Sequence, residues 1–395
     1  MKPIILLAGC LVCATSIRGA ETGQGSSLQS PYAKWEHGPP HNADYFPIGV
    51  WLQDPRDARQ YRAAGFNVYV GLWEGPTEDQ LAALKQARTR VICQQNATAR
   101  KHLDDPTIIG WMHSDEPDNA QVIDGSKGYG PPIPAGTIIQ DYLRIRTADP
   151  TRPVLLNLGQ GVAWDGWYGR GVRSNHPEDY PVYMRGSDIV SFDIYPVAHS
   201  NPEVSGKLWY VAQGVERLVK WAAGQKVVWN CIECTRIHSQ HKVTPSQVRS
   251  EVWMSLIHGS MGLIYFVHEW EPKFDQAALL HDPKMLRAVT AINLQIAELA
   301  PVLNSPTVSG GVQVSSSDPR VPVATMLKRH KGATYLFAVA MRSGETTATF
   351  TLNGIDGEKT VELLGEDRTL QASRGVFIDT FKEWAAHCYR IKAGL

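Results

Sequence analysis

The chain has 395 residues, which exceeds one compact core of ordinary size and fits a barrel of about 250 residues plus a smaller domain. Lys+Arg and Asp+Glu are balanced at 39 each. This balance argues against nucleic acid as a partner and against a polybasic membrane-binding surface.

The N-terminus predicts an export signal over residues 1–20. Lys2 is followed by an apolar run at 4–12 and then by small residues up to Ala20. The run is too short to span a bilayer, so we expect a periplasmic or extracellular protein without a membrane span. The segment ending at Cys10 also resembles a lipobox, and lipid anchoring through Cys10 is the alternative.

The cysteines outside that signal do not predict a disulfide framework or a metal site. The four are Cys93, Cys231, Cys234 and Cys388. Cys231 and Cys234 have CxxC spacing but lie in an apolar run that reads as a strand, where alternation sends them to opposite faces. We therefore expect buried thiols, and no metal or organic cofactor.

After an N-terminal arm at 21–44, apolar runs alternate with helical patterns. This alternation is typical of βα units around a parallel sheet. The predicted strands are 46–51, 65–71, 89–95, 108–116, 152–160, 188–197, 226–235 and 262–270. Eight strands close a (β/α)₈ barrel, which we assign to residues 45–304.

Helix signals support three of the connections. Thr77 and Gln80 form a capping box, Thr244 precedes a Pro at the first helical turn, and residues 206–224 keep apolar side chains at helical spacing. The first and third connections are short, and their helices are the least supported.

From residue 305 to 395 the pattern changes to short alternating segments separated by Gly, Asp and Asn. Alternation of apolar and polar residues is typical of antiparallel strands with one buried face. We predict a smaller antiparallel β-sandwich domain that shares a packed interface with the barrel.

The active site of a (β/α)₈ barrel lies at the carboxyl ends of its strands. Carboxylates, amides and large aromatics recur there: Trp51, Gln53, Trp73, Asp115, Glu116, Asn157, Asp193, Tyr195, Glu233, His268 and Trp270. Sugars need this mixture, because aromatic rings cover their C–H faces and amides or acids bind their hydroxyls. We therefore expect an oligo- or polysaccharide substrate; the sequence leaves the oligomeric state open.

Two of these carboxylates form a candidate catalytic pair. Glu116 ends the fourth strand before Pro117, and Glu233 ends the seventh strand. Strands four and seven face each other across a barrel mouth. Retaining glycoside hydrolysis needs two carboxyls about 5–5.5 Å apart, one as acid and one as nucleophile.

Three motifs resemble the large clan of retaining (β/α)₈ glycoside hydrolases. IIGWMHSDEP resembles its strand-four segment, WNCIECT its strand-seven segment and SFDIYP its strand-six segment. The resemblance implies a β-glycosidase with Glu116 as acid/base and Glu233 as nucleophile. It further implies that Tyr195 bonds the nucleophile and that Trp270 lies under the bound sugar.

One departure keeps other mechanisms open. The clan usually has Asn before its acid/base Glu, and this chain has Asp115. An Asp–Glu pair also resembles hexosaminidases in which the substrate's 2-acetamido group is the nucleophile. A non-catalytic carbohydrate-binding protein on a barrel scaffold is a third hypothesis, and a metal-dependent hydrolase is the least supported.

The connection at 159–187 is unusually long and contains many Gly, Trp, Tyr and charged residues. A loop of this length in a compact domain is usually functional or disordered. It follows strand five on the active-site side. We predict that it walls the substrate site, with Trp164 and Trp167 as contacts.

Overall fold

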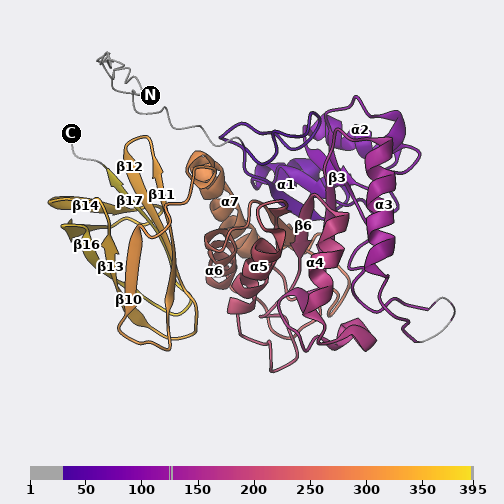
Figure 1. Cartoon of the computed structure of the whole chain (residues 1–395). Coiled ribbons are helices and arrows are strands. Elements are labelled where there is room, and N and C mark those ends of the chain that lie inside the picture. The colour runs from indigo at the N-terminus through magenta and orange to yellow at the C-terminus, as the bar shows by residue number, and fades with distance from the viewer. Residues whose placement is uncertain (1–29, 124, 126–127, 393–395) are drawn as a thin grey trace, which may run out of the picture.

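The computed structural model describes residues 30–123, 125 and 128–392. The predicted export signal and the lipid-anchor cysteine Cys10 lie outside the described residues. Figure 1 shows a barrel surrounded by helices and, beside it, a domain built from strands alone. The predicted (β/α)₈ barrel with a C-terminal antiparallel β domain is confirmed.

The barrel sheet is parallel, and each predicted strand is present with shorter bounds. The strands are β1 (Ile48–Trp51), β2 (Val68–Val70), β3 (Arg90–Cys93), β4 (Ile108–Met112), β5 (Val154–Leu158), β6 (Ile189–Phe192), β7 (Val227–Val228), β8 (Asn230–Glu233) and β9 (Leu263–Phe266). The pairing order runs from β7 through β1 and β9 to β8. Since β7 and β8 are consecutive pieces of one strand interrupted at Trp229, the two ends of this order meet and the barrel closes at eight positions.

The helices follow the capping signals of the sequence. They are α1 (Ala58–Ala63), α2 (Glu78–Ala87), α3 (Ala135–Ala148), α4 (Tyr180–Tyr183), α5 (Trp209–Ala222), α6 (Pro245–Ile257) and α7 (Pro283–Leu303). Thr77 and Thr244 both form complete capping boxes, with Gln80 and Gln247. As expected, the first connection holds only the six-residue α1. The third holds only a 3₁₀ turn, η2 (Ala99–Lys101).

The N-terminal arm contributes to the barrel core. Tyr32 and Trp35 are almost fully buried and pack with the residues that fill the barrel interior. The Tyr32 hydroxyl donates to the Met261 carbonyl over 2.8 Å and accepts from the Trp229 indole over 2.8 Å. Both aromatic rings bury a large apolar area, so this part of the arm is an integral part of the barrel core.

The C-terminal domain is an eight-stranded antiparallel sheet folded around its own core. Its strands are β10 (Val312–Ser316), β11 (Val323–His330), β12 (Ala333–Ala340), β13 (Thr346–Leu352), β14 (Glu358–Leu363), β15 (Thr369–Ser373), β16 (Val376–Phe381) and β17 (Ala386–Lys392). The order is β10-β13-β16-β15-β14-β17-β12-β11. Side chains alternate between buried and exposed along β13 and β16, as the sequence pattern predicts.

Helices α6 and α7 lie between the barrel and the β domain (Figure 1). Trp253 of α6 stacks on Phe337 of β12 with ring centroids 5.0 Å apart. The Lys328 ammonium donates to the carbonyls of Leu303 and Ser305 at the end of α7. The predicted packed interface between the two domains is therefore confirmed. Helix α7 is long and apolar enough to cross a membrane, and much of it is buried in this interface and the barrel layer.

Candidate active site

A cavity of about 520 Å³ opens at the carboxyl end of β4. Asp115 and Glu116, from the turn after β4, line it together with Trp167 and Tyr168 from the loop after β5. Glu116 has a φ of +42°, a left-handed conformation that is uncommon for a residue other than Gly. Backbone strain of this kind concentrates at functional sites, where surrounding contacts hold it in place.

The Glu116 carboxyl, which lines this cavity, lies beside the Asp193 carboxyl, near enough for the two to share a proton. Two carboxyls can hydrogen-bond only when one of them carries a proton. Burial, followed by the negative charge of Asp193, raises the pKa of Glu116 well above its ordinary value. Burial also raises the pKa of Asp193. The pair therefore holds one proton near neutral pH, as a general acid requires.

Asp115 is a third carboxylate, exposed to the cavity and held by a hydrogen bond. The Asn157 amide donates to Asp115 Oδ1 over 2.9 Å, and the Ser191 hydroxyl donates to the Asn157 carbonyl oxygen over 2.7 Å. Desolvation raises the pKa of Asp115 to about 6, and the Asn157 bond opposes that shift. Ser191 fixes which end of the Asn157 amide faces Asp115.

Asp118 is a fully buried carboxylate that the sequence analysis missed. It accepts the Gly159 backbone N–H over 2.9 Å and the Tyr180 hydroxyl over 3.1 Å, and it lies 3.9 Å from the Arg170 guanidinium. Burial raises its pKa, and these partners act against the rise. The sequence offered one signal for Asp118, which is its position two residues after Glu116. The partners of its carboxylate could not be predicted, because they lie far away in sequence.

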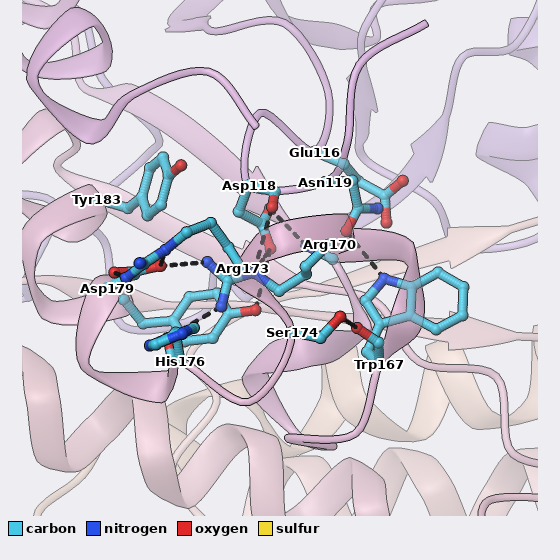
Figure 2. Close-up of polar contacts among 12 residues, drawn as sticks. Glu116, Asp118, Asn119, Trp167, Arg170, Arg173, Ser174, His176, Asp179 and Tyr183 are labelled. Atoms are coloured by element: carbon cyan, nitrogen blue, oxygen red, sulfur yellow. Dashed lines mark hydrogen bonds and ion pairs between the residues drawn. The ribbon is translucent and has the colours of Figure 1, made fainter. Parts of the chain in front are cut away.

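The loop at 159–187 is fastened to the turn after β4, as Figure 2 shows. Arg170 is 1% exposed and donates to the Asp118 carbonyl over 3.2 Å and to the Asp179 carboxylate over 2.7 Å. The Trp167 indole donates to Asn119 Oδ1 over 2.9 Å (Figure 2). The loop therefore forms a wall of the cavity, as predicted.

Of the two Trp residues predicted to contact substrate from this loop, only Trp167 lines the cavity. Trp164 is buried, and its indole donates to Glu203 Oε2 over 3.0 Å. Contact between Trp164 and a substrate therefore stays a prediction. Its ring supports Trp167, with the two ring centroids 6.0 Å apart.

Gly159 makes room for the Glu116 carboxyl. A Cβ atom at position 159 would lie 2.9 Å from Glu116 Oε1 and 2.7 Å from Asn119 Oδ1. The backbone of Gly159 is extended, with a φ of −81°. The need for Gly is therefore one of space rather than of backbone conformation.

Glu233 does not line the cavity that contains Glu116, and its surroundings argue against the predicted catalytic pair. It is fully buried and accepts the backbone N–H groups of Val197 and Ala198 over 2.7 and 2.9 Å. Its carboxyl also contacts that of Glu251 on α6, which is equally buried. Burial raises the pKa of both glutamates. Glu233 anchors the chain after β6 and has no access to a substrate here.

Two other predicted residues at strand ends are internal. Trp51 is 4% exposed and packs in the barrel core, a position that gives its predicted role in substrate binding no support. The Gln53 amide donates to the Gln276 carbonyl over 2.8 Å and accepts the Tyr61 hydroxyl over 2.7 Å. Gln53 still borders a second cavity of about 310 Å³, beside the strongly exposed Trp73.

An aromatic row leads away from the carboxyl cluster. The Tyr195 hydroxyl lies beside the Asp193 carboxyl without a well-formed hydrogen bond, and its ring is 5.1 Å from that of Phe266. Phe266 stacks on Trp270 at 5.6 Å, and His268 stacks on the same indole at 5.7 Å. Trp270 is 44% exposed. Sugar binding by Tyr195, His268 and Trp270 stays a prediction.

No group of three or more His, Cys, Asp or Glu side chains that could hold a metal ion occurs within the described ranges. Cys231 faces the barrel interior and Cys234 the layer between sheet and helices. Both are buried free thiols, as predicted from strand alternation.

No family model matches the chain, and no curated protein matches its sequence. Solved structures do resemble it. An α-amylase from Geobacillus thermoleovorans, complexed with acarbose, is 10% identical at a TM-score of 0.50, over 89% of this chain and 99% of that one. An Anoxybacillus α-amylase is 11% identical at 0.50, over 90% and 100%. A maltogenic α-amylase from Thermotoga neapolitana is 10% identical at 0.51, over 89% and 99%. At these identities the likeness establishes the fold alone, in which a barrel is followed by a β domain.

Proposed function

We propose that this chain is a glycoside hydrolase in which Glu116 is the general acid. The contact between the Glu116 and Asp193 carboxyls at the cavity carries the proposal, because it keeps a proton on an acid group where a glycosidic oxygen can enter. The fold is consistent with it, since the similar structures are named as amylases. We further propose that the N-terminal signal exports the enzyme.

The second catalytic group comes from the substrate in this proposal. Double displacement requires a nucleophile about 5–5.5 Å from the acid. Glu233 is enclosed by backbone amides, and Asp193 lies beside Glu116, where its role in this proposal is to hold the proton of the acid. A 2-acetamido group on the sugar removes the need for an enzyme nucleophile. This observation favours the substrate-assisted route over the two-glutamate route.

The acetamido carbonyl oxygen attacks the anomeric carbon while the bond to the leaving oxygen breaks, and Glu116 gives its proton to that oxygen. The Asp115 carboxylate, held by Asn157, accepts the acetamido N–H and stabilises the positive charge of the oxazolinium ring. Water then attacks the anomeric carbon, and the Glu116 carboxylate takes its proton. The acetamido group is restored and the configuration is retained.

This mechanism fixes the geometry of the substrate. Internal attack comes from the face of the acetamido group, so the leaving group must be on the opposite face of the ring. In gluco- and galacto-configured sugars that arrangement is the β-linkage. We therefore propose a β-linked 2-acetamido-2-deoxyhexoside as substrate.

The test is release of nitrophenol from a panel of glycosides with and without the 2-acetamido group. We expect cleavage of a β-N-acetylhexosaminide only. Glu116→Gln should slow it by about 10²- to 10⁴-fold, and less for a dinitrophenyl leaving group that needs no proton. Cleavage of a plain β-glucoside or β-galactoside at a comparable rate would contradict the proposal.

Glu233→Gln separates the two mechanisms. It should retain the rate to within about tenfold, because Glu233 is buried away from the substrate in this proposal and the amide oxygen can still accept one of the two backbone N–H groups. Replacing the substrate's acetyl group by trifluoroacetyl should slow wild type strongly, since the carbonyl oxygen becomes a weaker nucleophile. A rate that depends on Glu233 and ignores the acyl group would restore the double-displacement mechanism.

A further inference from the structure

A second cavity, far from the carboxyl cluster in sequence, lies at one end of the β domain. It measures about 560 Å³ and is formed by the β11–β12 hairpin, the β13–β14 connection and the end of β17. Its charged lining residues are Arg329, Lys331, Lys359 and Lys392, with Asp356 as the one acid; His330 also lines it. In Figure 1 the end of β17, where the described chain stops, lies at the hairpin end of this domain.

The strand register brings these cations together. Ala333 pairs with His330 on one side and with Lys392 on the other, so β12 lies between β11 and β17. β14 continues on the far side of β17, through the pair Val361 and Ile391. Four neighbouring strands therefore end around one cavity, and each of β11, β14 and β17 supplies a cation there.

Two of the cations project on the core side of the sheet. Arg329 is directly across from Thr334, which is directly across from Ile391. Paired residues point to the same face, and Ile391 belongs to the buried core of the domain. Lys359 lies two residues before Val361 of the same core and shares its face. Arg329 and Lys359 thus stand where the core layer opens to solvent.

The loop after β13 positions Arg329. Arg329 Nη2 donates to the Asn353 carbonyl over 2.7 Å. Gly354 has a φ of +76°, and a Cβ there would lie 3.0 Å from the same nitrogen. The loop backbone therefore packs against the guanidinium and accepts one of its N–H groups.

The charges in this cavity are not neutralised by ion pairs within residues 305–392. The ion pairs found in that part of the chain join other side chains: Arg320–Asp318, Arg368–Glu366, Arg368–Asp379, His387–Glu366 and Arg390–Glu362. Converging cations in a concave site bind anions with several oxygens, because each donor adds a charge-assisted hydrogen bond. The volume is in the range of small-ligand sites.

We propose that this cavity binds an anionic polysaccharide through its sulfate or carboxylate groups. No Trp, Tyr or Phe lines the cavity, so neither neutral sugar rings nor nucleobases have a stacking surface there. Ile355 is the one large apolar side chain in the lining and is half-buried, which is too little for insertion into a lipid surface. Because the net charge of the whole chain is balanced, the protein has no overall positive potential that would attract every polyanion. The proposal does not depend on the barrel's function.

The test uses the full chain with labelled heparin as a sulfated probe and hyaluronan as a carboxylate-only probe. We expect binding of at least one of them that weakens with salt. Arg329→Gln/Lys359→Gln should lose at least about tenfold in affinity. Arg320→Gln/Lys382→Gln, which removes the same charge from exposed positions of the same domain, should change it less than about twofold.

Tighter binding of heparin assigns the site to sulfate groups, and equal binding of both assigns it to carboxylates; both outcomes support the proposal. Three outcomes overturn it: unchanged binding in the double variant, equal competition by neutral dextran, and equally tight cavity-dependent binding of single-stranded DNA or phosphatidylserine vesicles. If the double variant does not fold, Lys331→Asn replaces it. Lys331 is exposed at the hairpin tip with a φ of +47°, which Asn tolerates.

Discussion

Asn157 donates its amide N–H to Asp115 Oδ1 over 2.9 Å, and this bond links the end of β5 to the turn after β4. Asn157 is buried, and Ser191 of β6 donates to its carbonyl oxygen. The orientation of Asp115 is therefore set by residues on two neighbouring strands. Residues on rigid strands hold a carboxylate in a more precise orientation than residues on a loop do.

Asn157→Ala should lower kcat/KM by about 10- to 100-fold, because a hydrogen bond to a charged group contributes about 1.5–3 kcal/mol. The bond lowers the pKa of Asp115, so its removal should also move the acidic limb of the pH–rate profile to higher pH. Ser191→Ala, which leaves Asn157 in place, should have a smaller effect in the same direction. An unmoved acidic limb in Asn157→Ala would show that ionised Asp115 is not required.

Gly159→Ala should lower activity while the protein stays folded. The new Cβ would collide with Glu116 Oε1 and Asn119 Oδ1, and the extended backbone accepts Ala. We expect kcat to fall at least about tenfold as the acid moves out of place. Gly136→Ala is the matched control, because nothing lies within 4 Å of a Cβ at that position near the start of α3. If both variants behave alike in activity assays, the cavity around Glu116 is not the catalytic site.

Arg170→Ala should loosen the wall formed by residues 159–187. It leaves the buried Asp118 carboxylate without its cationic partner, which costs about 3–5 kcal/mol, and it removes one of the two Arg partners of the partly buried Asp179. Arg173→Ala removes a half-exposed ion pair to the same Asp179 and should cost about 0–1 kcal/mol. Urea unfolding and protease cleavage within 159–187 measure the difference. Equal stability of the two variants would mean that the buried network does not hold the loop.

The sequence predicted the barrel well because parallel strands buried on both faces are near-continuous apolar runs. The run at 108–116 contains β4 (Ile108–Met112), and the run at 226–235 contains both β7 and β8. Boundaries were less accurate, since apolar residues continue past the last ladder hydrogen bond. The interruption at Trp229 leaves no trace in hydrophobicity, because the Trp ring is as buried as its neighbours.

The site was predicted in part. The sequence analysis selected Asp115, Glu116 and Asp193 because charged residues follow apolar strands at the carboxyl end of the barrel, and the first two line the cavity. Glu233 follows its strand in the same way, yet its carboxylate binds the backbone of Val197 and Ala198. The direction of a strand-end side chain depends on which loop amides lie beside it, and those amides carry no sequence signal.

The buried pair Glu233 and Glu251 predicts that stability falls as pH rises. Both carboxyls have a raised pKa in the folded protein, that of Glu233 reaching about 7. Below the ordinary glutamate pKa both are protonated in the folded and unfolded states, so the stabilisation is complete there. As pH rises toward the folded-state pKa, the unfolded chain has already released protons that the folded pair still holds, and stability is lost. The carboxyls of Glu116, Asp193 and Asp115 act in the same direction.

Glu251→Gln should therefore reduce the loss of thermal stability between about pH 5 and about pH 7.5, by about 2 °C in Tm. The amide cannot ionise and can donate to the Glu233 carboxylate, which keeps its bonds to Val197 and Ala198. Part of the pH dependence should remain, because the carboxyl cluster at the cavity is unchanged. Glu298→Gln, which removes an exposed carboxyl from α7, should leave the Tm profile unchanged. A Glu251→Gln profile that runs parallel to wild type would show that the pair does not retain a proton on folding.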